Sequence, residues 1–260
     1  MNNTISIKHS IDEAVKKLDK IHLRQVPFAE RQTLNELGQG TKREIDKQIL
    51  RRIDRPRAYT KRSMRVDFAK KNKPVTRVKV KDTATVTKRG FRGPDQIIGH
   101  LFTGGTRKLK GMEILLRKRG ILPQNRYIVI GEGAPQDRHG NIKAGMNIKI
   151  LSFLQAFKES GFRANADANG RKRIGRSLNK VARNGSFFVV KKRKIGGLHP
   201  GIWARIRFAS GTALKPMLMF VRKPTYRRII DIPKTANNHI RKNLNEVFNR
   251  QLRKAIATSR

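Results

Sequence analysis

The sequence contains no cysteine, few carboxylates and no long apolar run, and each absence excludes a class of protein. Without cysteine the chain can form neither a disulfide nor a thiolate metal site. No apolar run approaches the roughly 20 residues that a membrane-spanning helix needs. The first ten residues also lack the apolar core of a secretory signal peptide. We therefore expect a protein that assembles in a reducing cytoplasm and has no membrane among its partners.

Acidic residues are scarce beside basic ones, since 18 Asp and Glu stand against 61 Lys and Arg, which gives a net charge of +43. The excess is spread along the whole chain. Self-repulsion at this density disfavours a compact monomer at low salt. We expect the protein to lie against something negative, such as nucleic acid, an acidic membrane or acidic proteins, and charge alone leaves these open.

Apolar residues make up 37% of the chain, below the roughly 45–50% (glycine included) that is usual for globular domains. This content allows a hydrophobic core but predicts a thin one. We expect partner subunits to complete the burial of part of the apolar surface.

Apolar residues recur at helical spacing in several segments. Pro27 suits the first turn of a long helix, which should end before Pro56, and Gly120 suits the position that follows a helix. We expect Gly38 and Gly40 to bend or split the long helix, because glycine weakens helices. Helices are predicted over residues 11–23, 27 to about 54, 107–119, 150–157 and 235–257.

Short β-like runs lie between these helices, and in one of them Ile202, Ala204 and Ile206 alternate with more polar residues. Strands are predicted over residues 75–80, 83–87, 127–130, 186–191, 202–208 and 217–221. Helices and strands in separate blocks favour an α+β fold with an antiparallel β-sheet flanked by amphipathic helices at both termini.

The segment 161–185 is rich in Gly, Asn and Arg and poor in large apolar residues. We interpret it as a long, exposed, basic inserted loop that becomes ordered on binding. The chain then divides into an N-terminal helical region (1–54), a basic strand and helix region (55–160), this loop (161–185), and a region of strands and the C-terminal helix (186–260). We interpret the whole as one domain with an insertion.

The sequence offers little for catalysis. The run from Gly38 to Lys42 resembles part of a phosphate-binding loop, but its glycine spacing is wrong and no strand precedes it. Asp137 and His139 could belong to a metal-dependent site for cleaving nucleic acid, although Asp, Gly and Asn are also what a tight turn needs. We favour the turn and expect no enzyme, no metal and no cofactor.

Two runs of cations are candidates for contact with nucleic acid or with an acidic partner. The first interleaves cations with Tyr59 and Phe68, as proteins that bind nucleic-acid backbones often do. No helix-turn-helix, zinc-finger or RNA-recognition signature accompanies either run, so we expect salt-sensitive contact without base readout. The candidate residues are Arg55, Arg57, Lys61, Arg62 and Arg65 in the first run, and Arg171, Lys172, Arg173 and Arg176 in the second.

The two ends of the chain together carry a resemblance. The N-terminal part joins an amphipathic helix (11–23) to a long helix opened by Val26-Pro27 and then to a basic stretch before 75–80. The C-terminal part joins Lys215-Pro216 and an apolar strand to Ile230-Asp231-Ile232-Pro233 and a basic helix. This layout resembles the minor tail protein Z family of tailed bacteriophages, the lambda type, which includes tail-completion proteins.

The middle of the chain resembles uncharacterised phage and prophage proteins encoded among virion genes. The resemblance rests on Gly93-Pro94-Asp95-Gln96-Ile97, on the element from Lys110 through Pro123, on the loop 131–141 and on the strand around Trp203. The chain departs from the lambda type in being longer, with an insertion at about 90–200.

The resemblance implies a structural virion protein at or near the head–tail junction, assembled in the host cytoplasm as a six- or twelve-fold ring. Its implied partners are copies of itself, portal, adaptor or tail proteins, and packaged double-stranded DNA. We expect subunit contacts along the C-terminal helix. A general non-sequence-specific nucleic-acid-binding protein is the first alternative, and an enzyme centred on Asp137 and His139 is the second. The expected oligomer contacts are Ile240, Leu244, Val247, Phe248 and Leu252.

Overall fold

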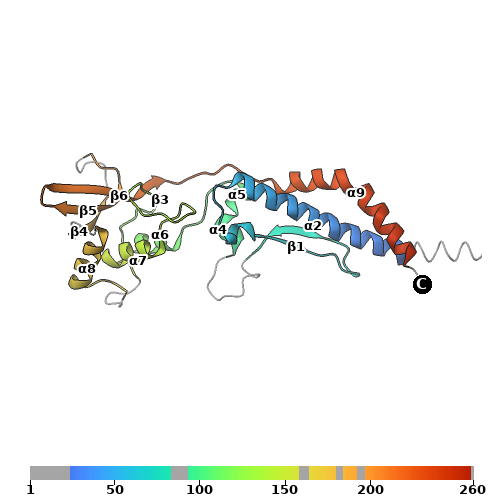
Figure 1. Cartoon of the computed structure of the whole chain (residues 1–260), viewed down its shortest axis with the longest axis horizontal. Helices are drawn as coiled ribbons and strands as arrows, with labels where there is room; N and C mark the ends of the chain where they lie inside the picture. The colour runs from blue at the N-terminus through green and yellow to red at the C-terminus, as the bar shows by residue number, and fades with distance from the viewer. Residues whose placement is uncertain (1–23, 83–92, 158–163, 180–183, 192–196, 259–260) are drawn as a thin grey trace, which may run out of the picture. The chain divides into compact units, whose positions relative to one another are not determined.

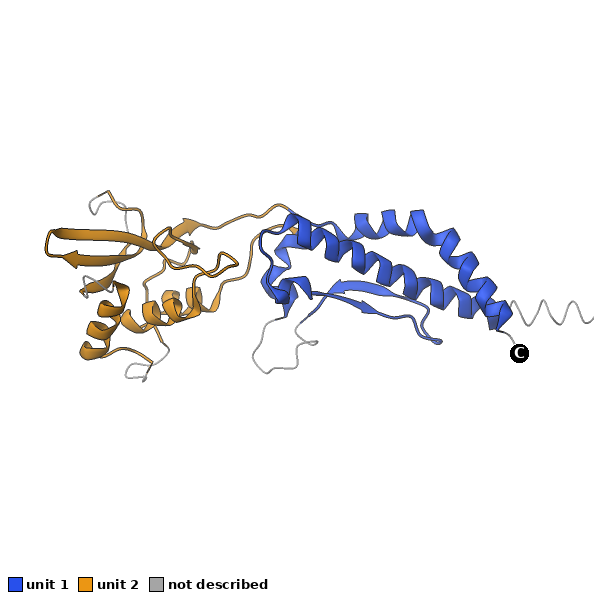
Figure 2. Ribbon diagram, viewed as in Figure 1, with its two compact units in different colours: residues 1–103, 228–260 blue, residues 104–227 orange. Residues whose placement is uncertain are grey.

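The computed structural model describes residues 24–82, 93–157, 164–179, 184–191 and 197–258 (Figure 1). The chain divides into two compact units, of which unit 1 joins residues 1–103 to 228–260 and unit 2 comprises residues 104–227 (Figure 2). Unit 2 is therefore inserted in the chain of unit 1. The predicted helix over 11–23 and the predicted strand over 83–87 lie outside the described residues.

Unit 1 is built on two long helices, α2 (Val26–Arg52) and α9 (Ile232–Ala257), which pack along each other. A two-stranded antiparallel sheet of β1 (Met64–Asp67) and β2 (Arg77–Val80) contacts α2. The main cluster of buried apolar residues comes from α2, β1, two short helices and the segment that leads into α9. Its buried members are Ile45, Ile49, Met64, Ile98, Phe102 and Ile230. The two short helices of this cluster are α4 (Pro94–Ile98) and α5 (His100–Thr103), and a further short helix, α3 (Ala58–Lys61), precedes β1.

Helix α2 runs without a break through Gly38 and Gly40, so the expected bend or split at these glycines is wrong. Tertiary packing explains both residues. A Cβ on Gly38 would lie 2.4 Å from the methyl group of Thr76, and a Cβ on Gly40 would lie 2.2 Å from the Nε2 atom of His239. The glycines let β2 and α9 approach the helix closely, and this contact offsets their low helix propensity.

Unit 2 contains a four-stranded antiparallel sheet with the order β3-β6-β5-β4. Its core joins Leu116, Ile150, Phe187, Ile202 and Leu218. Antiparallel strands beside helices confirm the predicted α+β class, although the strands divide between two sheets. The strands are β3 (Arg126–Ile130), β4 (Gly185–Val190), β5 (Gly201–Phe208) and β6 (Gly211–Arg222); the helices are α6 (Gly111–Lys118), α7 (Ala144–Phe153) and α8 (Ala168–Leu178).

Helix α8 corrects the prediction of a long basic loop over 161–185. The carboxylate of Asp167 caps the helix by accepting a 2.6 Å hydrogen bond from the backbone N–H of Gly170. Ile174 and Leu178, four residues apart, pack against the core of unit 2. Gly175 sits at a close contact with Gly185. The glycine-rich composition indicated a loop because glycine is common in turns. In the structure Gly175 instead allows close packing of the helix.

Two other helices in unit 2 have bounds that differ from those predicted. Helix α6 begins at Gly111 rather than near residue 107. Helix α7 begins at Ala144 and ends at Phe153, before the predicted end at 157. Gln155 follows α7 with a φ of 56°, so the chain turns away there. The positive φ of Gly120, 63°, agrees with its predicted place after α6.

A buried ion pair ties the start of α6 to strand β3. Arg107 donates two hydrogen bonds to the carboxylate of Glu113, at 2.8 and 2.6 Å, and a third to the carbonyl of Ile128 at 3.1 Å. Glu113 also accepts hydrogen bonds from the backbone N–H groups of Lys110 at 2.6 Å and Ile128 at 2.7 Å. Both carboxylate oxygens of Glu113 therefore accept hydrogen bonds from the protein itself.

The same contacts set the ionisation of Glu113. Burial alone raises the pKa of this carboxyl, but the hydrogen bonds from Arg107 and from the two backbone N–H groups outweigh it and hold the pKa below its usual range. A lowered pKa in the folded state means that the stabilisation is complete above the pKa of the unfolded chain. It is lost as the pH falls through the folded-state value.

We predict that Glu113→Gln lowers the free energy of unfolding of unit 2 by about 3–5 kcal/mol at neutral pH, because it leaves Arg107 buried without a counter-charge. The chain's single tryptophan, Trp203, is buried in β5 and reports unfolding of unit 2 by its fluorescence. The difference from wild type should shrink as the pH falls through the acid range.

The exposed Glu132 provides the matched control, and Glu132→Gln should cost less than about 0.5 kcal/mol. The double variant Arg107→Met with Glu113→Leu should recover part of the lost stability, because it removes both charges together but leaves backbone groups of Lys110 and Ile128 without their side-chain partners. Equal effects of the two glutamine variants at neutral pH would show that the buried pair does not anchor unit 2.

Candidate functional site

The first predicted cationic run surrounds the short helix α3 in unit 1. Arg57 is the N-cap residue of α3, Lys61 is its last residue, and Arg65 lies on β1. All five candidate side chains of this run are exposed. Arg55 pairs with Asp54 at 3.0 Å and Arg65 pairs with Asp67 at 2.8 Å. The run thus presents a cationic surface in which two neighbouring carboxylates offset part of the charge.

The second predicted run lies in unit 2, on the exposed face of α8. Arg171, Lys172 and Arg176 line a pocket of about 370 Å³ together with Phe153, Asn184 and Gly185. On the other flank of the helix, Arg173 lines a second pocket of about 630 Å³ with Lys149 and Ser177, among other residues. The structure therefore places cations on both flanks of one helix.

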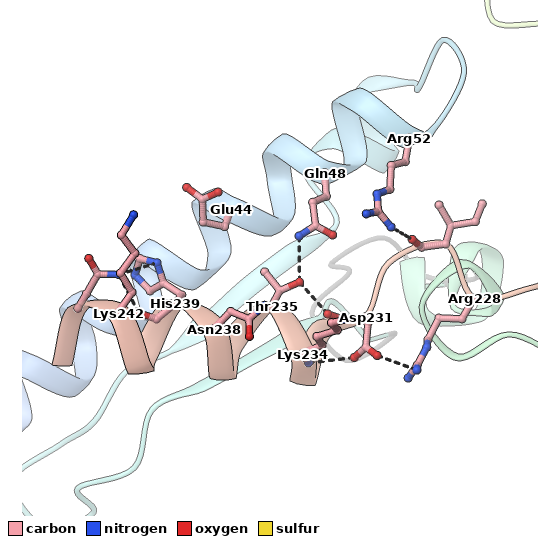
Figure 3. Close-up of a pocket in the computed structure, with 12 residues that line it drawn as sticks. Glu44, Gln48, Arg52, Arg228, Asp231, Lys234, Thr235, Asn238, His239 and Lys242 are labelled. Atoms are coloured by element: carbon pink, nitrogen blue, oxygen red, sulfur yellow. Dashed lines mark hydrogen bonds and ion pairs between the residues drawn. The ribbon is translucent and has the colours of Figure 1, made fainter.

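Sequence reasoning missed a polar groove of about 710 Å³ between α2 and α9 (Figure 3). Gln48 donates a 2.9 Å hydrogen bond to the hydroxyl of Thr235, 187 positions away in the chain. Arg52 closes one end by donating to the carbonyl of Ile229 at 2.7 Å. No sequence pattern marks such a groove, because its walls come from chain segments that meet only in the folded protein.

The described residues that line the groove include more cations than carboxylates. Its lining includes the cations Arg52, Arg228, Lys234 and Lys242 and the carboxylates Glu44 and Asp231. Asp231 pairs with Arg228 at 2.7 Å and caps α9 by accepting from the backbone N–H of Lys234 at 3.0 Å. The hydrogen bond from Lys47 is the main cause that lowers the pKa of Glu44. Both carboxylates are thus engaged by the protein itself.

The loop around Asp137 and His139 is a turn, as the favoured interpretation predicted. One carboxylate oxygen of Asp137 accepts hydrogen bonds from the backbone N–H groups of His139 at 2.8 Å and Asn141 at 3.0 Å. Gly140 adopts a φ of 74°. Within the described ranges no cluster of three or more His, Cys, Asp or Glu side chains could hold a metal ion. The run from Gly38 to Lys42 lies inside α2 and is therefore not a loop.

The five predicted oligomer contacts on α9 have different environments. Ile240 and Leu244 are 37% and 42% exposed, whereas Val247 is 7% exposed. Phe248 and Leu252 are half-buried. Val247 therefore belongs to the interior of unit 1, and Ile240 and Leu244 are the most exposed of the five. Ile256, 41% exposed, extends the apolar surface of this helix and was not among the predicted contacts.

In the part of the chain that the structure describes, no helix combines the length and the apolar character needed to cross a bilayer. Comparison of the chain with protein-family models, curated proteins and solved structures finds no match.

Proposed function

We propose that this protein is a non-enzymatic structural protein of a tailed-bacteriophage virion, of the neck or tail-completion type at the head–tail junction. It forms a homo-oligomeric ring whose basic surface contacts packaged DNA or acidic portal, adaptor or tail proteins. The observation that carries the proposal is the charge balance. Even if each of the 18 carboxylates neutralised one cation, 43 of the 61 would still lack an acidic partner within the chain.

The division of the chain supports the phage assignment. Most of the segments that carry the resemblance to the minor tail protein Z family, at the two chain ends, belong to unit 1. The extra length at about 90–200 belongs mostly to unit 2, which is inserted between them. Lys215-Pro216 and the apolar strand at 217–221 are the exceptions, because they lie in β6 of unit 2.

The exposed apolar side chains of α9 support ring assembly. Ile240 and Leu244 lie one helical turn apart, and burying them against a neighbouring subunit would stabilise the assembly. A ring of subunits also fits the low apolar content of 37%, because each neighbour buries surface that the thin core of one subunit leaves open.

We predict that the double variant Ile240→Asp with Leu244→Asp abolishes ring formation while the isolated chain stays folded, because both side chains are exposed. Mass photometry and negative-stain electron microscopy measure the assembly, and circular dichroism measures the helix content. As the contrasting control, Val247→Asp should unfold unit 1, because it places a charge at a buried position of α9. Rings of unchanged size in the double variant would overturn the assignment of this surface.

We also predict that replacing Arg55, Arg57, Lys61, Arg62 and Arg65 by Glu impairs particle assembly or DNA retention, because it changes the local charge by ten units. The measurement is the yield of infectious, DNA-filled particles after complementation with the variant. The matched control reverses five exposed cations of unit 2, Lys108, Lys118, Lys143, Lys191 and Arg207. Normal infectivity of the first variant would contradict the assigned role.

A general non-sequence-specific nucleic-acid-binding protein is the second candidate, and the cations on α8 favour it. Cryo-electron microscopy of purified particles and of the isolated protein separates the two. A symmetric ring at the head–tail junction supports the structural role. A monomer that binds DNA with a steep salt dependence and is absent from particles supports the second candidate instead.

A further inference from the structure

The pocket formed by Phe153, Arg171, Lys172, Arg176, Asn184 and Gly185, here the α8 pocket, depends on an unusually close approach between a helix and a strand. Strand β4 is the outer strand of its sheet and pairs with β5 alone. Helix α8 lies against β4 because two glycines meet. A Cβ on Gly175 would lie 2.1 Å from the carbonyl oxygen of Gly185. No larger residue at position 175 would let the cationic helix come so near without a shift.

The packing of α8 against the core of unit 2 determines which of its side chains are exposed. Ile174 and Leu178 pack against the core of unit 2 and Gly175 is buried. At 100° per residue, Lys172 and Arg176 point away from this packed face, whereas Arg171 lies on it, one turn before Ile174 and Gly175. All three side chains are exposed. The lining of the pocket is partly aromatic because it includes Phe153. The ring of Phe153 packs edge-on against Phe187 with the centroids 5.4 Å apart. The cations therefore surround a concave surface rather than a flat one.

Among the residues that the structure describes, none that lines the α8 pocket is a carboxylate. The acidic residue nearest in sequence, Asp167, caps α8 and lines the pocket on the other flank. This distinguishes the α8 pocket from the groove between α2 and α9, where Glu44 and Asp231 offset part of the charge. The described lining of the pocket thus gathers three cations without an acidic side chain among them.

Two of the three cations are arginines, whose planar guanidinium groups donate two parallel hydrogen bonds to a phosphate. Duplex DNA carries one negative charge for about every 1.7 Å of its axis, so neighbouring phosphates can meet cations that lie within two turns of one helix. We infer that the α8 pocket binds the phosphodiester backbone of a nucleic acid, without base readout. This inference deepens the proposed function, on which it rests for its biological setting, by naming DNA rather than acidic protein as the partner of this surface.

The test uses the full chain and a fluorescent DNA duplex of about 30 base pairs, with fluorescence anisotropy measured over a range of salt concentrations. The triple variant Arg171→Gln, Lys172→Gln and Arg176→Gln should weaken binding at least roughly tenfold near 150 mM salt. It should also reduce the slope of log affinity against log salt by about 2–3, since each lost phosphate contact removes about 0.9. Trp203 fluorescence checks that unit 2 remains folded.

The matched control replaces three exposed lysines elsewhere in unit 2, with Lys108→Gln, Lys118→Gln and Lys143→Gln. It loses the same net charge and should change the slope by less than about 1. The conservative variant Arg171→Lys with Arg176→Lys should retain most of the slope and lose some affinity, because lysine keeps the charge but not the guanidinium fork.

Equal slopes for the triple variant and its control would overturn the inference, and so would a wild-type chain that does not bind the duplex. A triple variant that loses binding to polyglutamate but keeps its binding to DNA would assign the pocket to acidic protein instead. Ring formation, measured separately by mass photometry, reports the proposed function. An intact ring with a failed α8 test therefore refutes only this inference, whereas DNA binding through α8 without a ring refutes only the virion role.

Discussion

Repulsion among 61 basic side chains, with only 18 carboxylates to offset it, is the constraint under which this chain folds. Several of the acids act as internal anchors. Glu113 joins α6 to β3 from a fully buried position. Asp167 and Asp231 each cap a helix, and Glu36 joins α2 to α9 through Arg250. Carboxylates used in this way leave large parts of the surface cationic, and we propose that an external partner meets that surface.

The two functions that we propose for the chain fall on different units. Unit 1 brings together α2 and α9 from far-separated parts of the sequence, and it carries the exposed apolar residues Ile240 and Leu244 that we assign to subunit contact. Unit 2 carries the α8 pocket that we assign to phosphate. Assembly and contact with DNA would then rest on separate folded bodies, so that each can be altered without unfolding the other.

Local patterns predicted the elements that local physics controls. Pro27 lies in the first turn of α2, the helix ends before Pro56, and Gly120 follows α6 with positive φ. The strands β3, β4 and β5 lie where alternation or short apolar runs placed them. Helix α8 was missed because Gly170 and Gly175 read as loop residues. Gly170 instead donates the capping hydrogen bond to Asp167, and Gly175 allows the close contact with Gly185 on β4, a contact that helical periodicity does not reveal.

The sequence by itself determined the charge excess, the α+β class and the positions of the cations, because composition and short-range periodicity depend on neighbouring residues alone. Only the tertiary structure decided which cations surround a pocket, that Val247 is internal while Ile240 and Leu244 are exposed, and that a groove lies between α2 and α9. These features arise where segments distant in the chain pack against each other. Their geometry depends on close contacts such as Gly40 with His239, which no local pattern encodes.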